Sequence, residues 1–203
     1  MFSRWGLRAS TAWNISGEPC SGAAVDDTDI DSDNKLKLGI KCVCSYNVST
    51  VCHITQLKVY ALDVVGQIPA ELQNLTYLTN LNLAQNYLAG SLPAFLGKLT
   101  RLQYLAISTN KFVGPLPEVV ENLSNLEQLY IDSCGLSGEL PSTFSKLKNL
   151  KVLRIGDLTG EVSSLAFVAN MTSLSTLVLR NSRISDNLAS VDFSKFLTSI
   201  IWT

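Results

Sequence analysis

The sequence predicts an α/β solenoid, in which one short structural unit is stacked on copies of itself. A 24-residue unit occurs five times in succession, and a sixth copy begins before the chain ends; the copies start at Val51, Leu75, Leu99, Leu123, Leu147 and Met171. Apolar residues occupy the same columns in each copy, and a glycine and a proline follow at recurring positions. One such unit cannot bury its apolar residues alone, so the copies are expected to share a continuous core.

Each unit contains a short strand with one buried face. Apolar residues alternate with other residues in every copy, as in Leu81 and Leu83 or Leu129 and Ile131. A period of two places alternate side chains on one face of a strand, so the strands are expected to form a parallel sheet on the inner side of a right-handed superhelix. The form L-x-x-L-x-x-L-x-L-x-x-N at this period is typical of a leucine-rich repeat.

The turn after each strand predicts buried polar groups. Asn86 and Asn110 follow two of the strands, where a side-chain amide can satisfy turn backbone that would otherwise lack partners. Cys134 stands at this position in the next copy, so we expect a buried free thiol there. Gly90 and its equivalents suit a backbone turn, and Pro93 and its equivalents suit the start of a short helical turn on the outer side.

Residues 1–50 are predicted to form an N-terminal cap, and residues 51–203 the repeats, five of 24 residues and a partial sixth. After the sixth strand the sequence runs to VDFSKFLTSIIWT with no closing cap, so Leu177, Leu179 and Ile184 are expected to face an unpaired end. We therefore interpret the chain as part of a longer protein. Its start, MFSRWGLRAS, has no apolar stretch of the kind a signal peptide needs, and no apolar run approaches the ~18–20 residues of a membrane-spanning helix.

Four of the five cysteines lie near the junction of the cap and the first repeat, namely Cys20, Cys42, Cys44 and Cys52. Such a cluster is typical of disulfides formed in an oxidising compartment. Four cysteines allow three pairings, of which we favour Cys20 with Cys42 and Cys44 with Cys52. Zinc is disfavoured because the spacing is irregular and His53 is the single histidine.

An acidic segment, DDTDIDSDN, runs from Asp26 to Asn34 and raises the question of calcium. An EF-hand loop needs glycine at its sixth position and glutamate at its twelfth. Counted from Asp29, those positions hold Asn34 and Ile40. We therefore expect a solvated acidic loop and no metal site.

Composition argues against several functions. The chain has 16 Lys and Arg against 17 Asp and Glu, which is too balanced to favour nucleic acid or an anionic membrane surface. His53 lies beside Cys52 in the junction, where packing is a better explanation than catalysis, and the glycines belong to repeat turns rather than to a phosphate loop. No catalytic residue and no cofactor are expected.

Five Asn-x-Ser/Thr sequences predict N-glycosylation, at Asn14, Asn47, Asn74, Asn122 and Asn170. The last three share one position of the repeat and lie two repeats apart. Glycans there would occupy one flank of the solenoid and leave the inner face free.

The repeat form LxxLxxLxLxxNxLxGxIPxxL, the cap motif WNISGEPCSG and the junction VCHITQLKVYALDVVGQIPAELQNLTYL carry a family resemblance. Over nearly the whole chain the sequence resembles the plant leucine-rich-repeat receptor-like serine/threonine kinases of the group with a malectin-like domain. The resemblance implies a parent protein with a signal peptide, more repeats, a malectin-like domain, one membrane helix and a cytoplasmic kinase, none of which is in this sequence. It implies a place on the extracellular face of the plasma membrane, or secretion.

Function is therefore expected on a surface. The outward strand positions form columns on the inner face, and tyrosine and arginine are common anchors of interfaces. We expect partner binding by Tyr60, Tyr104, Tyr130, Asp132, Arg154 and Arg180. The resemblance implies a peptide or protein ligand, a co-receptor ectodomain, or cell-wall carbohydrate through the malectin-like domain. The alternative is a secreted repeat protein that inhibits a pathogen enzyme; an enzyme in its own right is a third and weaker reading.

Overall fold

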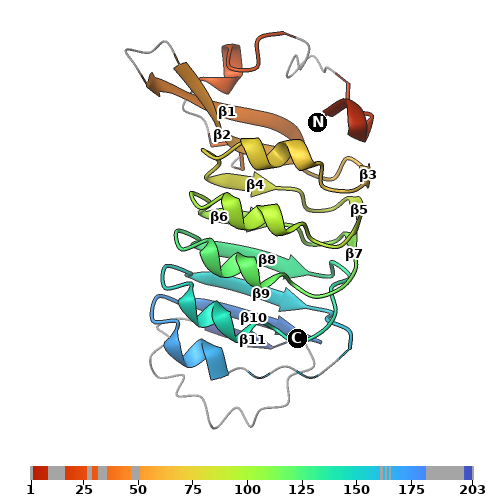
Figure 1. The fold of residues 1–203 in the computed structure, drawn as a ribbon, viewed down its shortest axis with the longest axis vertical. Helices are drawn as coiled ribbons and strands as arrows, with labels where there is room; N and C mark the ends of the chain where they lie inside the picture. Colours follow the sequence, from red (N-terminus) through yellow and green to blue (C-terminus); the bar gives the residue numbers. More distant parts are fainter. Residues whose placement is uncertain are drawn as a thin grey trace.

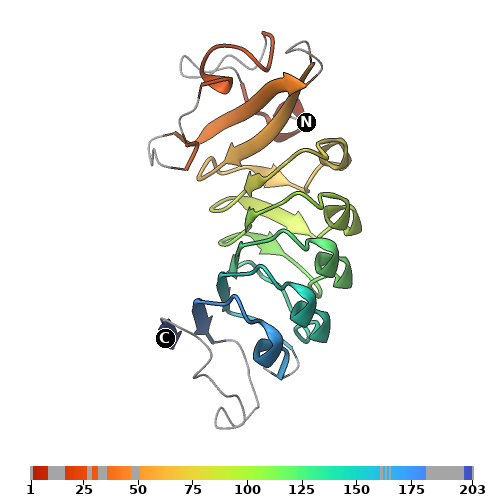
Figure 2. The ribbon, with the colours of Figure 1, turned by 90° about the vertical axis from the view of Figure 1, so that its left-hand side faces the viewer.

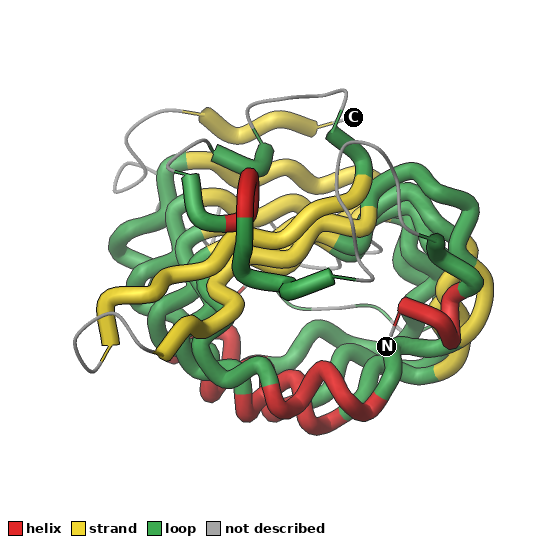
Figure 3. Tube along the Cα trace, turned by 90° about the horizontal axis from the view of Figure 1, so that it is seen from above, coloured by secondary structure: helices red, strands yellow, loops and turns green. Residues whose placement is uncertain are grey.

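The structure, a computed structural model, is a stack of similar coils capped at its N-terminal end (Figure 1). It describes residues 2–8, 17–26, 29–31, 36–46, 51–160, 162, 164, 166–181 and 199–202. The predicted solenoid of parallel strands is confirmed. Figures 2 and 3 show that the strands of the main sheet lie along one side of the stack and most of the helices along the opposite side.

The main sheet has eight strands in the order β1-β2-β4-β6-β8-β9-β10-β11. They are β1 (Leu38–Tyr46), β2 (Val51–Val59), β4 (Asn80–Asn82), β6 (Tyr104–Ala106), β8 (Gln128–Asp132), β9 (Val152–Gly156), β10 (Thr176–Arg180) and β11 (Ser199–Trp202). From β2 to β10 the strands pair in parallel, each residue opposite the one 24 positions later, as Leu81 lies opposite Leu105 and Leu105 opposite Leu129. The sequence period is therefore the register of the sheet.

The core consists of the superposed apolar columns. Leu81 and Leu129 have no exposed surface, and Leu105 is 2% exposed. The neighbour of each buried strand residue points the other way, since side chains alternate across a strand. In β8 the buried Leu129 and Ile131 accordingly alternate with partly exposed Gln128, Tyr130 and Asp132.

Five short 3₁₀ helices form the outer side of the repeats, namely η3 (Ala70–Asn74), η4 (Ala94–Lys98), η5 (Glu118–Asn122), η6 (Ser142–Lys146) and η7 (Ala166–Asn170). The first four begin directly after Pro69, Pro93, Pro117 and Pro141. Proline suits this place because it has no N–H to satisfy and its fixed φ leads into the helical turn. A second small sheet joins β3 (Val65–Gly66), β5 (Tyr87–Gly90) and β7 (Lys111–Phe112) between strands and helices.

Buried asparagines link successive coils, as the repeat pattern predicts. The Asn110 amide nitrogen donates to the carbonyl of Leu83 in the preceding coil and to that of Ile107 in its own, at 3.0 and 2.9 Å, while its oxygen accepts from the Leu88 N–H. Cys134, at the same position of the next coil, donates its thiol to the Ile131 carbonyl and is buried and free. Burial raises the pKa of this thiol to about 11.

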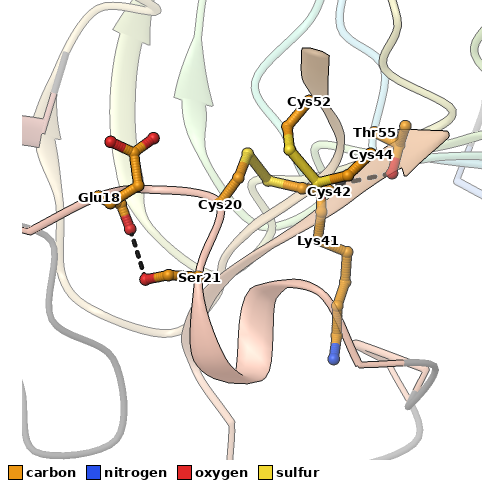
Figure 4. Close-up of a disulfide and its surroundings, with 8 residues drawn as sticks. All are labelled: Glu18, Cys20, Ser21, Lys41, Cys42, Cys44, Cys52 and Thr55. Atoms are coloured by element: carbon orange, nitrogen blue, oxygen red, sulfur yellow. Dashed lines mark hydrogen bonds between the residues drawn. A yellow bond between two sulfur atoms is a disulfide. The ribbon is translucent and has the colours of Figure 1, made fainter. Parts of the chain in front are cut away.

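The cap closes the N-terminal end of the stack through an antiparallel β1–β2 hairpin. Figure 4 shows two disulfides at this hairpin, Cys20–Cys42 and Cys44–Cys52, which are the favoured pairings. The cap also contains η1 (Phe2–Trp5) and η2 (Gly22–Ala24). Trp5 is buried, and its indole N–H donates to the Gln67 carbonyl at 3.0 Å.

One expectation about the last strand is wrong. The sequence predicts that Leu177 and Leu179 face an unpaired end, but β11 pairs in parallel with β10 along its length, and both leucines are buried. The free edge of a parallel strand offers a row of unsatisfied N–H and C=O groups, which an additional strand satisfies. Ile184 lies outside the described residues.

Candidate functional site

The inner face is the side of the main sheet that points away from the core. It comprises the outward side chains of β2, β4, β6, β8, β9 and β10 and of the residues that directly follow these strands. Of the residues that the sequence nominates for partner binding, five lie in these strands and Tyr60 directly follows β2. Because the buried leucines superpose from coil to coil, the outward positions also superpose, so the face is a regular array of columns.

Five of the six nominated residues meet at one hollow of about 280 Å³; these are Tyr60, Tyr104, Tyr130, Asp132 and Arg154. We call it the tyrosine hollow. It exists because Ala84 and Ala106, which also line it, occupy outward positions between the larger side chains. The sequence names the residues around the hollow but does not show that they converge.

Aromatic and charged groups are combined in the tyrosine hollow. The ring centroids of Tyr104 and Tyr130 lie 5.3 Å apart with the planes inclined by 39°. The Arg154 guanidinium lies 5.9 Å from the Tyr130 ring centroid, and its Nε lies 3.7 Å from Asp132 Oδ1. The hollow therefore offers apolar ring surface beside one cation and one carboxylate.

Both central tyrosines remain neutral phenols at physiological pH. Burial, with Asp31 as the next cause, holds the pKa of Tyr104 well above its ordinary value. Burial also raises the pKa of Tyr130, although the positive charge of Arg154 opposes the shift. The Tyr130 hydroxyl donates to Gln128 Oε1 at 2.9 Å. The site therefore presents hydroxyl groups and ring faces rather than phenolate charge.

The sixth nominated residue, Arg180, does not line the hollow. Its guanidinium donates to Ser133 Oγ and pairs with Asp157, so it forms part of a surface network on the last coils. Hydrogen bonds from Ser133 and then Arg180 lower the pKa of Asp157. Arg180 is therefore already engaged within the chain.

Sequence reasoning missed Asp31, which reaches the inner face from the cap. Its carboxylate accepts hydrogen bonds from the side-chain amides of Asn80 and Asn82 at 2.7 and 3.0 Å and lies 3.4 Å from Lys58 Nζ. Lys58 is buried and also donates to the Ile30 carbonyl at 2.9 Å. The prediction of a solvated loop is wrong for this residue. The sequence does contain a signal that could have indicated this contact, namely a lysine and two asparagines in adjacent outward columns, close to an acidic cap.

The structure describes three of the five predicted glycosylation sites. Asn74, Asn122 and Asn170 are exposed, and each is the last residue of an outer helix, η3, η5 and η7. They lie on the helical side and not on the inner face. Asn14 and Asn47 lie outside the described residues.

His53 takes part in packing at the edge of the first coils. Its ring stacks on Tyr77 with centroids 3.6 Å apart, and the Arg101 guanidinium lies 4.2 Å from the Tyr77 ring centroid. Within the described ranges no three His, Cys, Asp or Glu side chains are grouped to hold a metal ion. In the same part of the chain, no helix is long and apolar enough to cross a bilayer.

Comparison with known families identifies the repeats. The family profile described as "Leucine-rich repeat region" matches residues 94–199, about half of the chain, and that described as "Leucine Rich Repeat" matches residues 77–99. The chain belongs to the leucine-rich repeat proteins.

Curated relatives of this leucine-rich repeat chain are receptor kinases of Arabidopsis thaliana. Over 79 residues it is 56% identical to the probable LRR receptor-like serine/threonine-protein kinase At1g56130, a match that covers 39% of this chain and 8% of the relative. The aligned segment therefore spans less than a tenth of the length of that relative. The resemblance to receptor-like kinases is confirmed as homology over this segment, whereas the subgroup with a malectin-like domain is not decided by it.

Solved structures with the same fold include plant receptors and ectodomains. The plant peptide hormone receptor RGFR1 in complex with RGF2 superposes with a TM-score of 0.60 at 27% identity, covering 64% of this leucine-rich repeat chain and 21% of the receptor. A chain of the BIR3–SERK2 complex from Arabidopsis thaliana gives a TM-score of 0.55 at 29% identity, covering 64% of this chain and 68% of that one.

Proposed function

We propose that this chain is a ligand-recognition segment of the extracellular region of a plant receptor-like serine/threonine kinase, and that its inner face binds an extended peptide or protein segment. The parent would signal at the plasma membrane and, from the sequence resemblance, belong to the group with a malectin-like domain. The chain itself would bind and not catalyse.

The convergence of Tyr60, Tyr104, Tyr130, Asp132 and Arg154 at one hollow carries this proposal. Six strands at a spacing of about 4.8 Å give a face roughly 25–30 Å long, which suits an extended peptide or one face of a small domain. Tyrosine and arginine supply large contact areas and directional hydrogen bonds, and they dominate the energetics of many interfaces.

The comparisons with solved structures also support recognition of a peptide or protein partner. One structural neighbour is a peptide hormone receptor in complex with RGF2, and another belongs to a complex of two proteins, BIR3 and SERK2. By analogy, a peptide ligand and a second ectodomain are the partners we propose here. The two disulfides are consistent with folding in an oxidising, extracellular compartment.

N-glycosylation would complement this arrangement. We propose glycans on Asn74, Asn122 and Asn170, together with Asn14 and Asn47. The first three are exposed at the ends of outer helices, so glycans there would shield the helical flank and direct a protein partner to the inner face.

The test is selection of binders from a displayed library of random dodecapeptides against the secreted, disulfide-bonded chain. Selected peptides should lose about tenfold or more in affinity for the Tyr130→Ala variant, because an interface anchor of this kind is commonly worth more than 1 kcal/mol. Tyr87→Ala is the matched control, since Tyr87 is an exposed tyrosine on β5, away from the inner face.

Failure to recover any binder sensitive to Tyr130→Ala would overturn the proposal. The alternative, a secreted inhibitor of a pathogen enzyme, would use the same surface, so the full transcript distinguishes the two. A downstream membrane helix and kinase support the receptor, and a closing repeat followed by a stop codon supports the inhibitor.

A further inference from the structure

A second hollow, of about 330 Å³, lies beside the tyrosine hollow, nearer the N-terminal ends of the strands. The two share Tyr104, so they are adjacent on the inner face, and we refer to them together as the groove. We call the second one the acceptor hollow. Its walls come from the cap and from β2, β4, β6 and β8, and three of its lining residues are carboxylates, Asp29, Asp31 and Glu127. Among the residues that the structure describes, neither lysine nor arginine is part of its lining.

The carboxylates are fixed in place by neighbouring groups. Asp31 is held by the Asn80 and Asn82 amides and by Lys58, and Glu127 pairs with Lys151 at 2.7 Å. A carboxylate has about four acceptor positions, so both groups keep capacity for a further donor. Because these contacts orient them in advance, little ordering is needed when a ligand arrives.

Two side-chain amide oxygens at the acceptor hollow provide a second, independent observation. Gln56 Oε1 and Asn80 Oδ1 are buried and have no hydrogen-bond partner within the part of the chain that the structure describes, and both residues line the acceptor hollow. The Asn80 amide cannot be reversed without cost, because its nitrogen donates to Asp31. A buried acceptor without a donor is unfavourable, so a ligand that brings donors would relieve two such groups at once.

The electrostatic environment of Tyr104, where the two hollows meet, is also negative. Asp31 contributes to the rise in the pKa of Tyr104, second only to burial. The negative charge of Asp31 therefore acts on the residue that the two hollows share. Arg154, by contrast, lines only the tyrosine hollow. The groove is thus acidic and rich in acceptors near the N-terminal ends of the strands, and it carries a guanidinium in the neighbouring tyrosine hollow.

We propose that the acceptor hollow binds the basic side chain of an arginine or lysine in the peptide ligand. An ammonium or guanidinium group carries only donors, which matches a hollow whose unused groups are acceptors. This basic residue would then lie near the N-terminal ends of the strands, with neighbouring residues of the peptide over Tyr104 and Tyr130. This inference rests on the proposed peptide-binding function and adds the chemistry of one ligand residue and its place on the inner face.

Gln103 allows a test by charge alone. It is exposed and lines the acceptor hollow, so Gln103→Lys and Gln103→Glu add opposite charges at one place. Peptides selected from the dodecapeptide library should be rich in arginine or lysine at one position. Their affinity should fall about tenfold for Gln103→Lys and rise about threefold for Gln103→Glu, and both effects should weaken with added salt.

Two matched controls make the result specific. Replacing the basic residue of a selected peptide by glutamine should lower its affinity for the unaltered chain and abolish its response to both Gln103 variants. Gln85→Lys and Gln85→Glu place the same charges at an exposed position of the tyrosine hollow, and they should not reproduce the pattern.

The outcomes separate this inference from the proposed function. Binders that depend on Tyr130 but contain no basic residue, or that do not respond to the charge at position 103, would overturn the basic-residue subsite and leave peptide recognition standing. A failure to obtain any binder dependent on the inner face would overturn both.

Discussion

The ring of Tyr104 on β6 lies against that of Tyr130 on the adjacent strand β8, although the two residues are not paired in register. Tyr104 is paired with Gln128, and Tyr130 is the diagonal neighbour two residues further along. Diagonal neighbours on one face of a sheet are within reach of aromatic side chains. This contact joins two repeat columns and forms the centre of the groove.

Leu129 and Tyr130 test the strand register directly. Leu129→Ala should lower the free energy of unfolding by about 2–5 kcal/mol, because it opens a cavity in a fully buried column. Tyr130→Ala should cost less than about 1.5 kcal/mol, the order of one aromatic contact, since the side chain is partly exposed. Urea unfolding of the two variants would measure the difference. Equal destabilisation would contradict the assignment of opposite faces.

Gly135 tests a close backbone approach. Its φ is +82°, and a Cβ at this position would lie 2.3 Å from the Phe112 carbonyl oxygen. Gly114, with φ of +80° and its nearest neighbouring atom at 3.6 Å, is a matched control. Gly114→Ala should cost about 1–2 kcal/mol for the left-handed conformation alone. Gly135→Ala should cost clearly more, because the backbone must also move. Similar melting temperatures for the two variants would argue against the close approach.

Asn86 tests the hydrogen bonds between coils. Its side-chain oxygen accepts from the N–H groups of Leu62 and Val64, so Asn86→Ala leaves both donors without this partner. We expect a loss of about 3 kcal/mol or more, since each unsatisfied buried group costs roughly 1–3 kcal/mol. Cys134→Ala, which removes a single bond to the Ile131 carbonyl, should cost less. Calorimetry of the two variants would reveal the order, and a reversal would show that the asparagine position does not link the coils.

Cys134 tests burial through its reactivity. Burial raises its pKa from 9.0 to about 11, so the native state favours the neutral thiol. This contribution to stability is complete below pH 9 and is lost as the pH rises through about 11. Iodoacetamide at pH 8 should therefore label the native chain far more slowly than the urea-unfolded chain. Intact-mass spectrometry under non-reducing conditions would follow the single free thiol, with Cys134→Ala as the unlabelled control. Equal rates in both states would contradict a buried thiol.

Much of the fold could be predicted because its signals are periodic. The 24-residue period places Leu81, Leu105 and Leu129 in one column, and the structure pairs them in the predicted register. The favoured disulfides could also be anticipated, since Cys44 and Cys52 are eight positions apart in the sequence and Cys20 and Cys42 both lie in the cap. The list of outward residues followed from strand alternation, although their meeting at one hollow did not.

Other features depend on contacts between segments that no local pattern connects. Asp31 lies 51 positions from Asn82, and neither residue alone indicates the other. The pairing of β11 with β10 likewise depends on an unpaired edge, which exists only once the coils are stacked. Arg180 is likewise brought close to its partners Ser133 and Asp157 by the stacking, across two repeats and one repeat respectively.

The sequence by itself determined which side chains form the core and which face outward, because a repeated unit can bury its leucines only against equivalent leucines. Only the tertiary structure decided how the outward side chains combine. The two hollows arise where small residues, tyrosines and an acid from the cap meet across several coils, and their depth and charge depend on distances that residue order does not encode.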